Sequence, residues 1–222
     1  MGPADEDAAG YGALRRRMVE EQIAARGVRD PRVLQAMADV RRHLFVDEAQ
    51  RGRAYEDWPL PIGHGQTISQ PYMVAVMTEY LELRGEERVL EVGTGSGYQA
   101  AVLGHLAREV FTVERIAPLA EAAAVRLREL GYANIHVLVG NGAQGLPEHA
   151  PFDRVLVTAA CPILPAALVA QLAEGGIIVA PVGEAWSGQT LRVGWKVAGR
   201  LTTQDVLGCI FVPLIGAEDR AA

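Results

Sequence analysis

Three glycines at alternating positions are the first residues that suggest chemistry. Gly93, Gly95 and Gly97 follow the strand-like run Val89–Val92 and precede a helix-forming segment, Gln99–Leu106. A tight glycine turn between a strand and a helix lets the main chain approach a ligand closely, because glycine has no Cβ. The free N–H groups at the start of the helix then face that ligand. The pattern predicts a site for a nucleotide-like cofactor.

Two polar residues at the ends of later strands fit the same site. Glu114 lies about 20 positions after the glycines, where an acid can accept hydrogen bonds from both hydroxyls of a ribose. It could instead serve as an ordinary acid at the start of the next helix. Asn141 follows the expected strand Ile135–Val139 and could accept a hydrogen bond from an adenine amino group. A plain Asn-Gly turn is the alternative at Asn141.

The glycine spacing does not select the cofactor. Counted from Gly93, the third glycine of the dinucleotide fingerprint is replaced by Tyr98. The relaxed form that ends in alanine does fit, from Gly95 through Gly97 to Ala100. Nicotinamide dinucleotides and S-adenosylmethionine both carry an adenosine ribose, so both stay open on this evidence.

Strands and helices are expected to alternate from residue 88 onward. This order predicts an α/β fold with a doubly wound, mostly parallel, Rossmann-like sheet. The last two strands are separated by only three residues, so we expect an antiparallel hairpin at the C-terminal end. The expected strands are Arg88–Val92, Glu109–Val113, Ile135–Val139, Asp153–Thr158, Gly176–Val182, Thr190–Val197 and Leu201–Val212, and the helices between them are Gln99–Leu106, Leu119–Leu130 and Pro165–Leu172.

The N-terminal part lacks this alternation and is predicted to consist of helices and a loop. An amphipathic helix is predicted over Tyr11–Ala25, and Asp30 is predicted to cap a second helix that starts at Pro31. The stretch Arg42–Ile62 is expected to be a packed loop. We expect residues 1–10 to be disordered and residues 11–222 to form one domain, with a helical and loop cap at 11–80, a cofactor core at 81–185 and C-terminal strands at 186–215.

Composition excludes several classes of protein. The net charge of −6 over 222 residues argues against general nucleic-acid binding. No apolar run approaches the roughly 18 residues that a membrane span needs. Cys161 and Cys209 form neither a disulfide framework nor a zinc set, so we expect free thiols, no metal and a reducing, cytoplasmic location.

A more specific signal precedes the glycines. The segment Ala54–Ala75 contains Gly65-Gln66-Thr67-Ile68-Ser69. Together with Leu90–Leu103, Ala150–Asp153, Val157–Ala160 and the closing Phe211–Leu214, it closely resembles the protein-L-isoaspartate O-methyltransferase family. The resemblance extends over Leu14 to Leu214, nearly the whole chain.

The resemblance implies an enzyme that uses S-adenosyl-L-methionine and releases S-adenosyl-L-homocysteine. The implied acceptor is the α-carboxylate of L-isoaspartyl residues in damaged proteins and peptides, whose methylation initiates repair through a succinimide. A monomer that binds neither nucleic acid nor membrane is expected. The implied cofactor-binding residues are Gln66, Thr67, Ile68, Glu91, Gly93, Thr94, Gly95, Gly97, Glu114, Asn141 and Gly142; Thr67, Ile68, Ser69 and Val212 would bind substrate, and Ser69 would be catalytic.

Methyl transfer to a carboxylate needs no strong base, because the acceptor is ionised about three pH units below neutrality. We therefore expect Ser69 to orient the acceptor by a hydrogen bond; its alternative role is to cap a helix that begins at Pro71. His64 is interpreted as a loop residue at the substrate rim. The strand Phe211–Pro213, or an extended loop, is expected to pair with the substrate main chain. Asn141 stands where the family usually has Asp, which removes one negative charge near the adenine.

Three alternatives to isoaspartyl methylation stay open. The same chemistry could act on one aspartate of a dedicated peptide, and the catalytic motifs would look identical. The chain could also bind S-adenosylmethionine without catalysis. A nicotinamide-dependent dehydrogenase is a more distant possibility.

Overall fold

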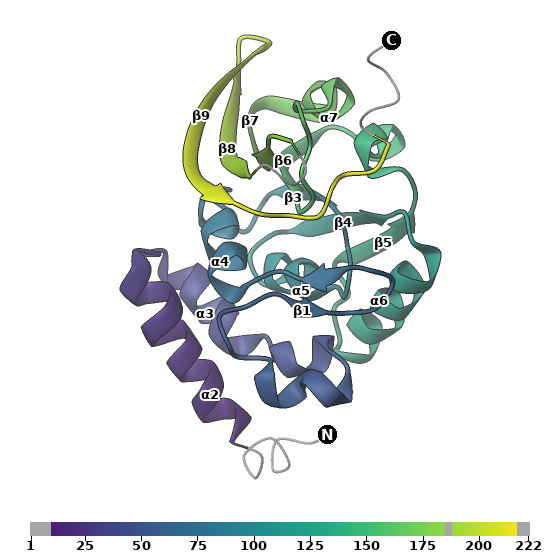
Figure 1. Cartoon of the computed structure of the whole chain (residues 1–222). Coiled ribbons are helices and arrows are strands. Elements are labelled where there is room, and N and C mark those ends of the chain that lie inside the picture. Colours follow the sequence, from purple (N-terminus) through teal and green to yellow (C-terminus); the bar gives the residue numbers. More distant parts are fainter. Residues whose placement is uncertain (1–9, 185–187, 217–222) are drawn as a thin grey trace. The chain divides into compact units, whose positions relative to one another are not determined.

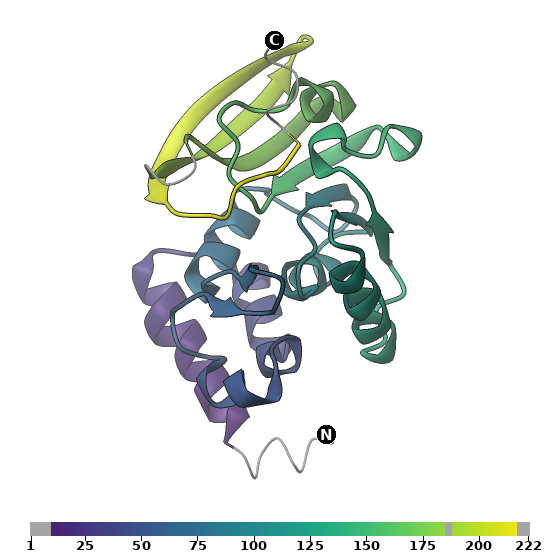
Figure 2. The same ribbon diagram turned by 45° about the vertical axis from the view of Figure 1, so that its right-hand side comes forward.

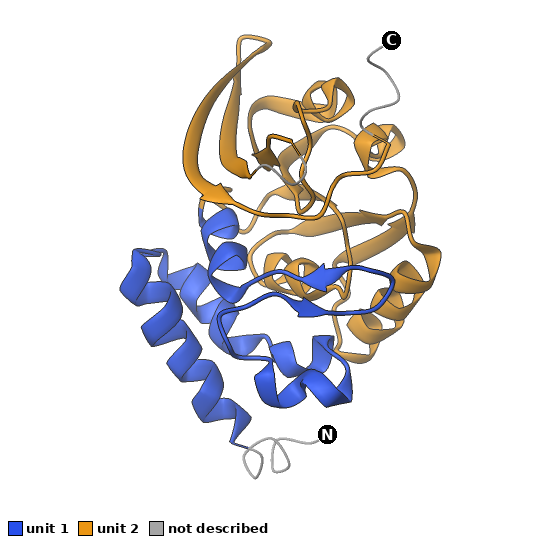
Figure 3. Cartoon of the chain, in the orientation of Figure 1, with its two compact units in different colours: residues 1–79 blue, residues 80–222 orange. Residues whose placement is uncertain are grey.

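The computed structural model describes residues 10–184 and 188–216. The chain divides into two compact units, residues 1–79 and residues 80–222 (Figure 3). The predicted disordered segment falls almost wholly on residues 1–9, which lie outside the described residues. Gly10 is described and forms the left-handed N-cap of the first helix.

Unit 1 opens with a helical segment that changes its winding. Helix α2 (Tyr11–Arg17) continues into the π-helix η1 (Met18–Ile23) and the 3₁₀ turn η2 (Ala24–Arg26). The helix predicted over Tyr11–Ala25 is therefore present, but its winding changes along its length. Met18 and Ile23 are both fully buried and lie five residues apart, which matches the wider turn of a π-helix.

The rest of unit 1 is more regular than a packed loop. The expected loop over Arg42–Ile62 contains two short helices and a strand, and this corrects the prediction. Single turns of 3₁₀ helix and two-residue strands are too short to leave a periodic pattern in a sequence. The elements are α3 (Pro31–Asp39), η3 (Arg42–Phe45), η4 (Glu48–Arg53), β1 (Leu60–Pro61), β2 (Thr67–Ile68) and α4 (Pro71–Glu79) (Figure 1).

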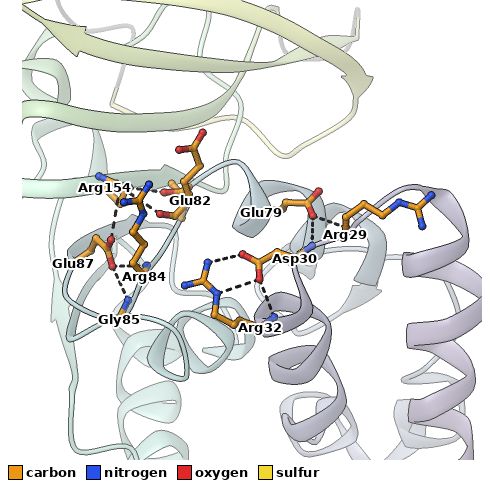
Figure 4. Close-up of polar contacts among 10 residues, drawn as sticks. Arg29, Asp30, Arg32, Glu79, Glu82, Arg84, Gly85, Glu87 and Arg154 are labelled. Carbon is orange, nitrogen blue, oxygen red and sulfur yellow. Dashed lines mark hydrogen bonds and ion pairs between the residues drawn. The ribbon is translucent and has the colours of Figure 1, made fainter.

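Two carboxylates fix the start of α3 and the end of α4. Asp30 accepts a hydrogen bond from the Arg32 backbone N–H at 2.8 Å and caps α3, as predicted. Glu79, the last residue of α4, accepts the backbone N–H groups of Arg29 and Asp30 (Figure 4). The C-terminus of α4 is thereby tied to the start of α3.

Unit 2 is built on a seven-stranded sheet with the order β5-β4-β3-β6-β7-β8-β9 (Figures 1 and 2). The first five strands of this order are parallel, and β8 and β9 are antiparallel. The predicted doubly wound sheet with a C-terminal hairpin is confirmed. Its strands are β3 (Arg88–Val92), β4 (Glu109–Glu114), β5 (Ile135–Val139), β6 (Phe152–Val157), β7 (Leu172–Val182), β8 (Gln189–Val197) and β9 (Arg200–Cys209), and its helices are α5 (Tyr98–Gly104), α6 (Ala117–Glu129) and α7 (Ala166–Gln171), with the 3₁₀ turns η5 (Gly142–Gln144) and η6 (Pro147–His149).

The last strand ends earlier than predicted. The expected strand Leu201–Val212 stops at Cys209, because the chain then leaves β8 and runs beside Ala160 (Figures 1 and 2). The Ala160 N–H donates to the Val212 carbonyl at 2.8 Å, and the Leu214 N–H donates to the Ala160 carbonyl at 2.7 Å. Phe211–Pro213 is therefore not part of the β9 edge, which corrects the expected strand.

The entry into β3 is held by a second carboxylate. Glu87 accepts the backbone N–H groups of Arg84 and Gly85, and its other oxygen lies 3.8 Å from the Arg154 guanidinium (Figure 4). Burial alone would raise the pKa of Glu87, but these N–H bonds and Arg154 hold it below its ordinary value. Arg154 also donates to the Leu81 carbonyl, so the chain leading into β3 is fixed to β6.

The core of unit 2 lies on the strands themselves. The apolar side chains of the inner strands β3, β4, β6 and β7 are almost completely buried, as expected of strands covered on both faces, whereas those of the edge strands β5 and β9 are partly exposed. Among residues 10–184 and 188–216, no helix combines the length and apolar character that a membrane crossing requires. The fully buried strand residues include Val89, Leu90, Val110, Val155, Leu156, Val157, Ile178 and Val179.

Candidate active site

The glycine turn after β3 has the conformation that the sequence predicts. Gly93, Gly95 and Gly97 have φ angles of 102°, 52° and 87°, a region that side-chain-bearing residues rarely adopt. A Cβ on Gly93 would overlap the hydroxyl of Thr158. The Gly97 N–H donates to the Thr94 carbonyl at 2.8 Å and closes the turn. Gly93 and Gly95 are half-buried and Gly97 is buried, so the main chain is partly accessible at the first two glycines.

Thr158 connects the turn to the neighbouring strand. It follows β6, and its hydroxyl lies 2.9 Å from the Val92 carbonyl and 2.8 Å from the Gly93 carbonyl. The strand order reverses between β3 and β6, which is where open α/β sheets bind ligands. Sequence reasoning assigned Thr158 no role, although a threonine at a strand end beside the switch point was a usable signal.

Glu114 accepts hydrogen bonds from two backbone groups of unit 2. One carboxylate oxygen accepts the Gly95 N–H and the other accepts the Ile116 N–H, each at 3.0 Å. The first bond belongs to the glycine turn, and the second lies at the N-cap of α6. Each oxygen has further acceptor capacity, so ribose hydroxyls can bind in addition.

Glu91 is the most unusual polar group of the site. It is fully buried on β3, and neither oxygen of its carboxyl has a hydrogen-bond partner among the described residues. The Thr112 hydroxyl lies beside it on β4 but is bonded to the Thr94 hydroxyl at 2.7 Å. Burial raises the pKa of Glu91 to about 8; the nearby Thr112 hydroxyl acts against this shift, and the Glu114 carboxylate adds to it.

Asn141 and Gly142 lie at the end of β5. The Asn141 Oδ1 atom accepts the Ala143 N–H at 3.0 Å and caps η5, so the Asn-Gly turn considered for this residue exists. The side chain of Asn141 is exposed. A Cβ on Gly142 would overlap the side chain of Val92, which brings this loop against the end of β3.

Gln171 holds the following loop and was missed by sequence reasoning. Its Oε1 atom accepts the Leu146 N–H at 2.7 Å, and its Nε2 atom donates to the Gln144 carbonyl at 2.8 Å. Gly145 lies against this amide with a φ of 64°, and a side chain there would overlap it. The side-chain amide of Gln171 thus provides the hydrogen bonds that a neighbouring strand would otherwise provide to the backbone of the loop after Asn141. A lone glutamine at a helix end gives no sequence signal for such a role.

In unit 1, the Gln66–Ser69 segment is presented by a small hairpin. β1 and β2 pair antiparallel, with Leu60 opposite Ile68. The turn between them passes through Gly63, His64 and Gly65, all with positive φ, which places His64 in an exposed loop as expected. Ile68 is buried and anchors β2, whereas Thr67 is exposed.

Ser69 does not cap α4. Its hydroxyl forms no hydrogen bond within the part of the chain that the structure describes, and the cap is supplied by Asp57 instead. Asp57 accepts the Tyr72 N–H at 3.4 Å, the Gln70 side-chain amide at 2.7 Å and the Arg26 guanidinium at 2.6 Å. The capping alternative for Ser69 is therefore wrong, and Asp57, which carried no predicted role, fixes Gln70 and Tyr72, which follow Ser69.

The predicted residues therefore fall into two sets. The first surrounds the glycine turn in unit 2, and the second forms the hairpin segment in unit 1. Val212 belongs to neither set and lies past β9, bonded to Ala160. The first set contains Glu91, Gly93, Thr94, Gly95, Gly97, Glu114, Asn141 and Gly142, and the second contains Gln66, Thr67, Ile68 and Ser69.

The residues of unit 2 fit an adenosine-containing cofactor with a cationic end. A Cβ on Gly93 would overlap Thr158, the main chain is partly accessible at Gly93 and Gly95, and Glu114 supplies carboxylate acceptors next to the turn. The buried carboxyl of Glu91 lacks a partner that a cation or donor could supply. In the part of the chain that the structure describes, no group of His, Cys, Asp and Glu side chains could hold a metal ion.

The fold and this site define a Rossmann-like methyltransferase. A family model described as protein-L-isoaspartate(D-aspartate) O-methyltransferase matches residues 14–219. The chain belongs to this family. It is 53% identical over 208 residues to the protein-L-isoaspartate O-methyltransferase of Trichlorobacter lovleyi, with 94% of this chain and 96% of the relative aligned.

Two solved structures extend the comparison. A protein-L-isoaspartate O-methyltransferase superposes with a TM-score of 0.83 at 28% identity over 91% of this chain; the chain spans 66% of that longer one. A β-aspartate methyltransferase from Plasmodium falciparum, solved with S-adenosyl-L-homocysteine, gives a TM-score of 0.78 at 27% identity, covering 90% of this chain and 97% of the other.

Proposed function

We propose that this protein transfers a methyl group from S-adenosyl-L-methionine to the α-carboxylate of L-isoaspartyl residues in damaged proteins. The product is an ester that can close to a succinimide and so begin repair. The observation that carries the proposal is the bonding of Glu114 to the glycine turn, in a chain that belongs to a family of this name.

The residues around the turn would divide the cofactor between them. Gly93 and Gly95 face the methionine part, Glu114 the ribose, and Asn141 with Gly142 the adenine. The bound S-adenosyl-L-homocysteine in the Plasmodium falciparum relative supports a cofactor of this kind. The cofactor supplies a methyl group on a sulfonium.

The hairpin segment of unit 1 would handle the acceptor. Ser69 donates a hydrogen bond that orients the acceptor carboxylate, while Thr67 and Ile68 line the path between acceptor and donor. A carboxylate oxygen forms the new C–O bond as the C–S bond breaks, and the electron pair of that bond stays on sulfur. No base is needed, because the acceptor is ionised before it binds. Val212 would contact the substrate main chain.

A methyl-transfer assay on paired peptides tests the proposal. Two peptides of one sequence, one with L-isoaspartate and one with aspartate, are incubated with labelled S-adenosyl-L-methionine, and base-labile label is counted. We expect methylation of the isoaspartyl peptide alone. Equal methylation of normal aspartate would instead indicate a dedicated aspartyl methyltransferase, and binding without transfer would indicate a non-catalytic protein.

The role of Ser69 has its own test. Ser69→Ala should lower kcat on the isoaspartyl peptide at least about 10-fold, the usual worth of a hydrogen bond to a charged group. Thr203→Ala, an exposed change on β9, serves as the control. An unchanged kcat for Ser69→Ala would exclude the orienting role.

We further propose that the enzyme works in the cytoplasm as a monomer. The free thiols of Cys161 and Cys209 support a reducing compartment. Sedimentation of the purified protein would test the monomeric state.

A further inference from the structure

The buried carboxyl of Glu91 is not explained by the packing around it. Its side chain is 0% exposed, and both oxygens are without a hydrogen-bond partner among the described residues. An ionised carboxylate in such surroundings is costly unless it is paired. An acid with a purely structural role is expected to accept hydrogen bonds from the protein, as Glu87 and Glu114 do from backbone N–H groups.

We propose that Glu91 is protonated in the ligand-free protein and releases its proton to solvent when the cationic methionine end of the cofactor binds. This inference rests on the proposed function. It makes Glu91 a positioning residue that is neutral when the site is empty and carries a negative charge when the site is filled.

The position of Glu91 gives the first argument. It lies on β3 two residues before Gly93, so it underlies the turn that is proposed to hold the methionine part. At neutral pH that part carries an ammonium group, which is absent from the adenosine part. A cation brought near a buried carboxyl favours its ionised form. The carboxyl would then gain the partner that the protein itself does not provide.

The charges around Glu91 give the second argument. On β4, Thr112 is uncharged and bonded to Thr94, and Glu114 brings a negative charge that opposes ionisation. On β6, the residue opposite Glu91 is the apolar Leu156.

The helices near the turn do not change this balance. In α6, the Arg126 guanidinium donates to the Ser96 carbonyl at 2.8 Å. In α5, Tyr98 and Gln99 lie buried without charge. Among the described residues of unit 2, the charge that acts on Glu91 is therefore that of Glu114, and it favours the protonated form.

The size of the effect follows from the raised pKa. With a pKa of about 8, the carboxyl is about 0.9 protonated at pH 7 and about half protonated at pH 8. If binding lowers this pKa well below 7, each mole of bound cofactor releases about 0.9 mole of protons at pH 7. The number should fall to about 0.5 at pH 8 and approach zero near pH 9.

Calorimetric titration measures this number directly. S-adenosyl-L-homocysteine is titrated into the protein in buffers of different ionisation enthalpy, and the dependence of the binding heat on that enthalpy gives the protons released. Adenosine, which lacks the methionine part, is the ligand control. We expect release with S-adenosyl-L-homocysteine and none with adenosine.

Two variants identify the group that releases the proton. Glu91→Gln keeps the shape of the side chain and cannot ionise, so the release should disappear. Glu121→Gln, an exposed change on α6, should leave the release unchanged. Release that persists in Glu91→Gln, or no release in the unaltered protein, would overturn the proposal. Absence of any S-adenosyl-L-homocysteine binding would overturn the proposed function as well. Binding without proton release would overturn only the proposal for Glu91, so the two failures are distinguishable.

An infrared difference spectrum makes the test independent of whether Glu91→Gln folds. Binding of S-adenosyl-L-homocysteine to the unaltered protein should remove the carbonyl stretch of one protonated carboxyl. Persistence of that band after saturation would also overturn the proposal.

Discussion

The buried carboxyl of Glu91 should make the stability of the ligand-free protein depend on pH. Its pKa rises from 4.5, its ordinary value, to about 8 in the fold. Because the folded value is the higher one, the native state binds the proton more tightly than the unfolded chain does. The resulting stabilisation is complete below pH 4.5, and it is lost progressively as the pH rises through 8.

The magnitude follows from the same shift. At about 1.4 kcal/mol for each pH unit, a shift from 4.5 to about 8 corresponds to on the order of 5 kcal/mol across the whole range. Between pH 5 and pH 9, roughly 4 kcal/mol of this should be lost. That is a large part of the roughly 5–15 kcal/mol by which folded proteins are usually stable.

Glu91→Gln removes this dependence and should reveal it by comparison. The glutamine is neutral at every pH, so the variant should gain stability relative to the unaltered protein as the pH rises. Urea unfolding at pH 5, 7 and 9, without cofactor, gives the free energy of unfolding for each protein. Glu121→Gln is the control, and it should follow the unaltered protein closely.

The comparison also shows what would refute the reasoning. If the difference in unfolding free energy between Glu91→Gln and the unaltered protein is the same at pH 5 and pH 9, Glu91 does not titrate in the fold as proposed. A decrease of that difference with rising pH would mean that the ionised carboxylate of Glu91 is stabilised in the fold by a group that is not among its described neighbours.

Three further changes test the glycine turn, the loop after β5 and Asn141. Gly93→Ala should weaken S-adenosyl-L-homocysteine binding at least about 10-fold, because its Cβ would overlap Thr158 at a positive φ; calorimetry measures it. Gln171→Leu removes two bonds to the loop after β5 and should lower the free energy of unfolding by about 1–3 kcal/mol in urea titrations. Asn141→Asp keeps the bond from Ala143 and replaces the Nδ2 donor by an acceptor for the adenine amino group; we expect roughly 2- to 10-fold tighter S-adenosyl-L-homocysteine binding.

The sheet of unit 2 was predictable because its strands carry an uninterrupted signal. Val89–Val92, apolar except for Glu91, and the apolar run Val155–Val157 are rich in valine and bounded by turn residues, which indicates buried parallel strands. The short connection Ala198–Arg200 likewise required antiparallel neighbours. The end of β9 was not predictable, since the chain departs at Ile210 to pair with Ala160, a partner about fifty residues away.

The contacts that fix the site were hidden for the same reason. Thr158 bonds the glycine turn from 65 residues away, and Gln171 bonds the loop at Leu146 from 25 residues away. Asp57 caps α4 from outside the helix, although the local pattern suggested Ser69 as an alternative cap. Local spacing specifies which residues have the right chemistry, whereas the side chain that satisfies a given backbone group is decided by the folded chain.

At Glu114 and Asn141, the structural and ligand-binding interpretations describe the same arrangement. Each side chain accepts a hydrogen bond from a nearby backbone N–H group. Glu114 accepts from Ile116, and Asn141 accepts from Ala143. That bond fixes the rotamer before a ligand arrives, so less side-chain freedom is lost on binding. The further bond from Gly95 to Glu114 ties the acid to the turn itself. A helix-start acid at a strand end can therefore serve as a preorganised acceptor, whereas the Glu91 carboxyl, which has no hydrogen-bond partner among the described residues, is the group that we propose changes its protonation state on cofactor binding.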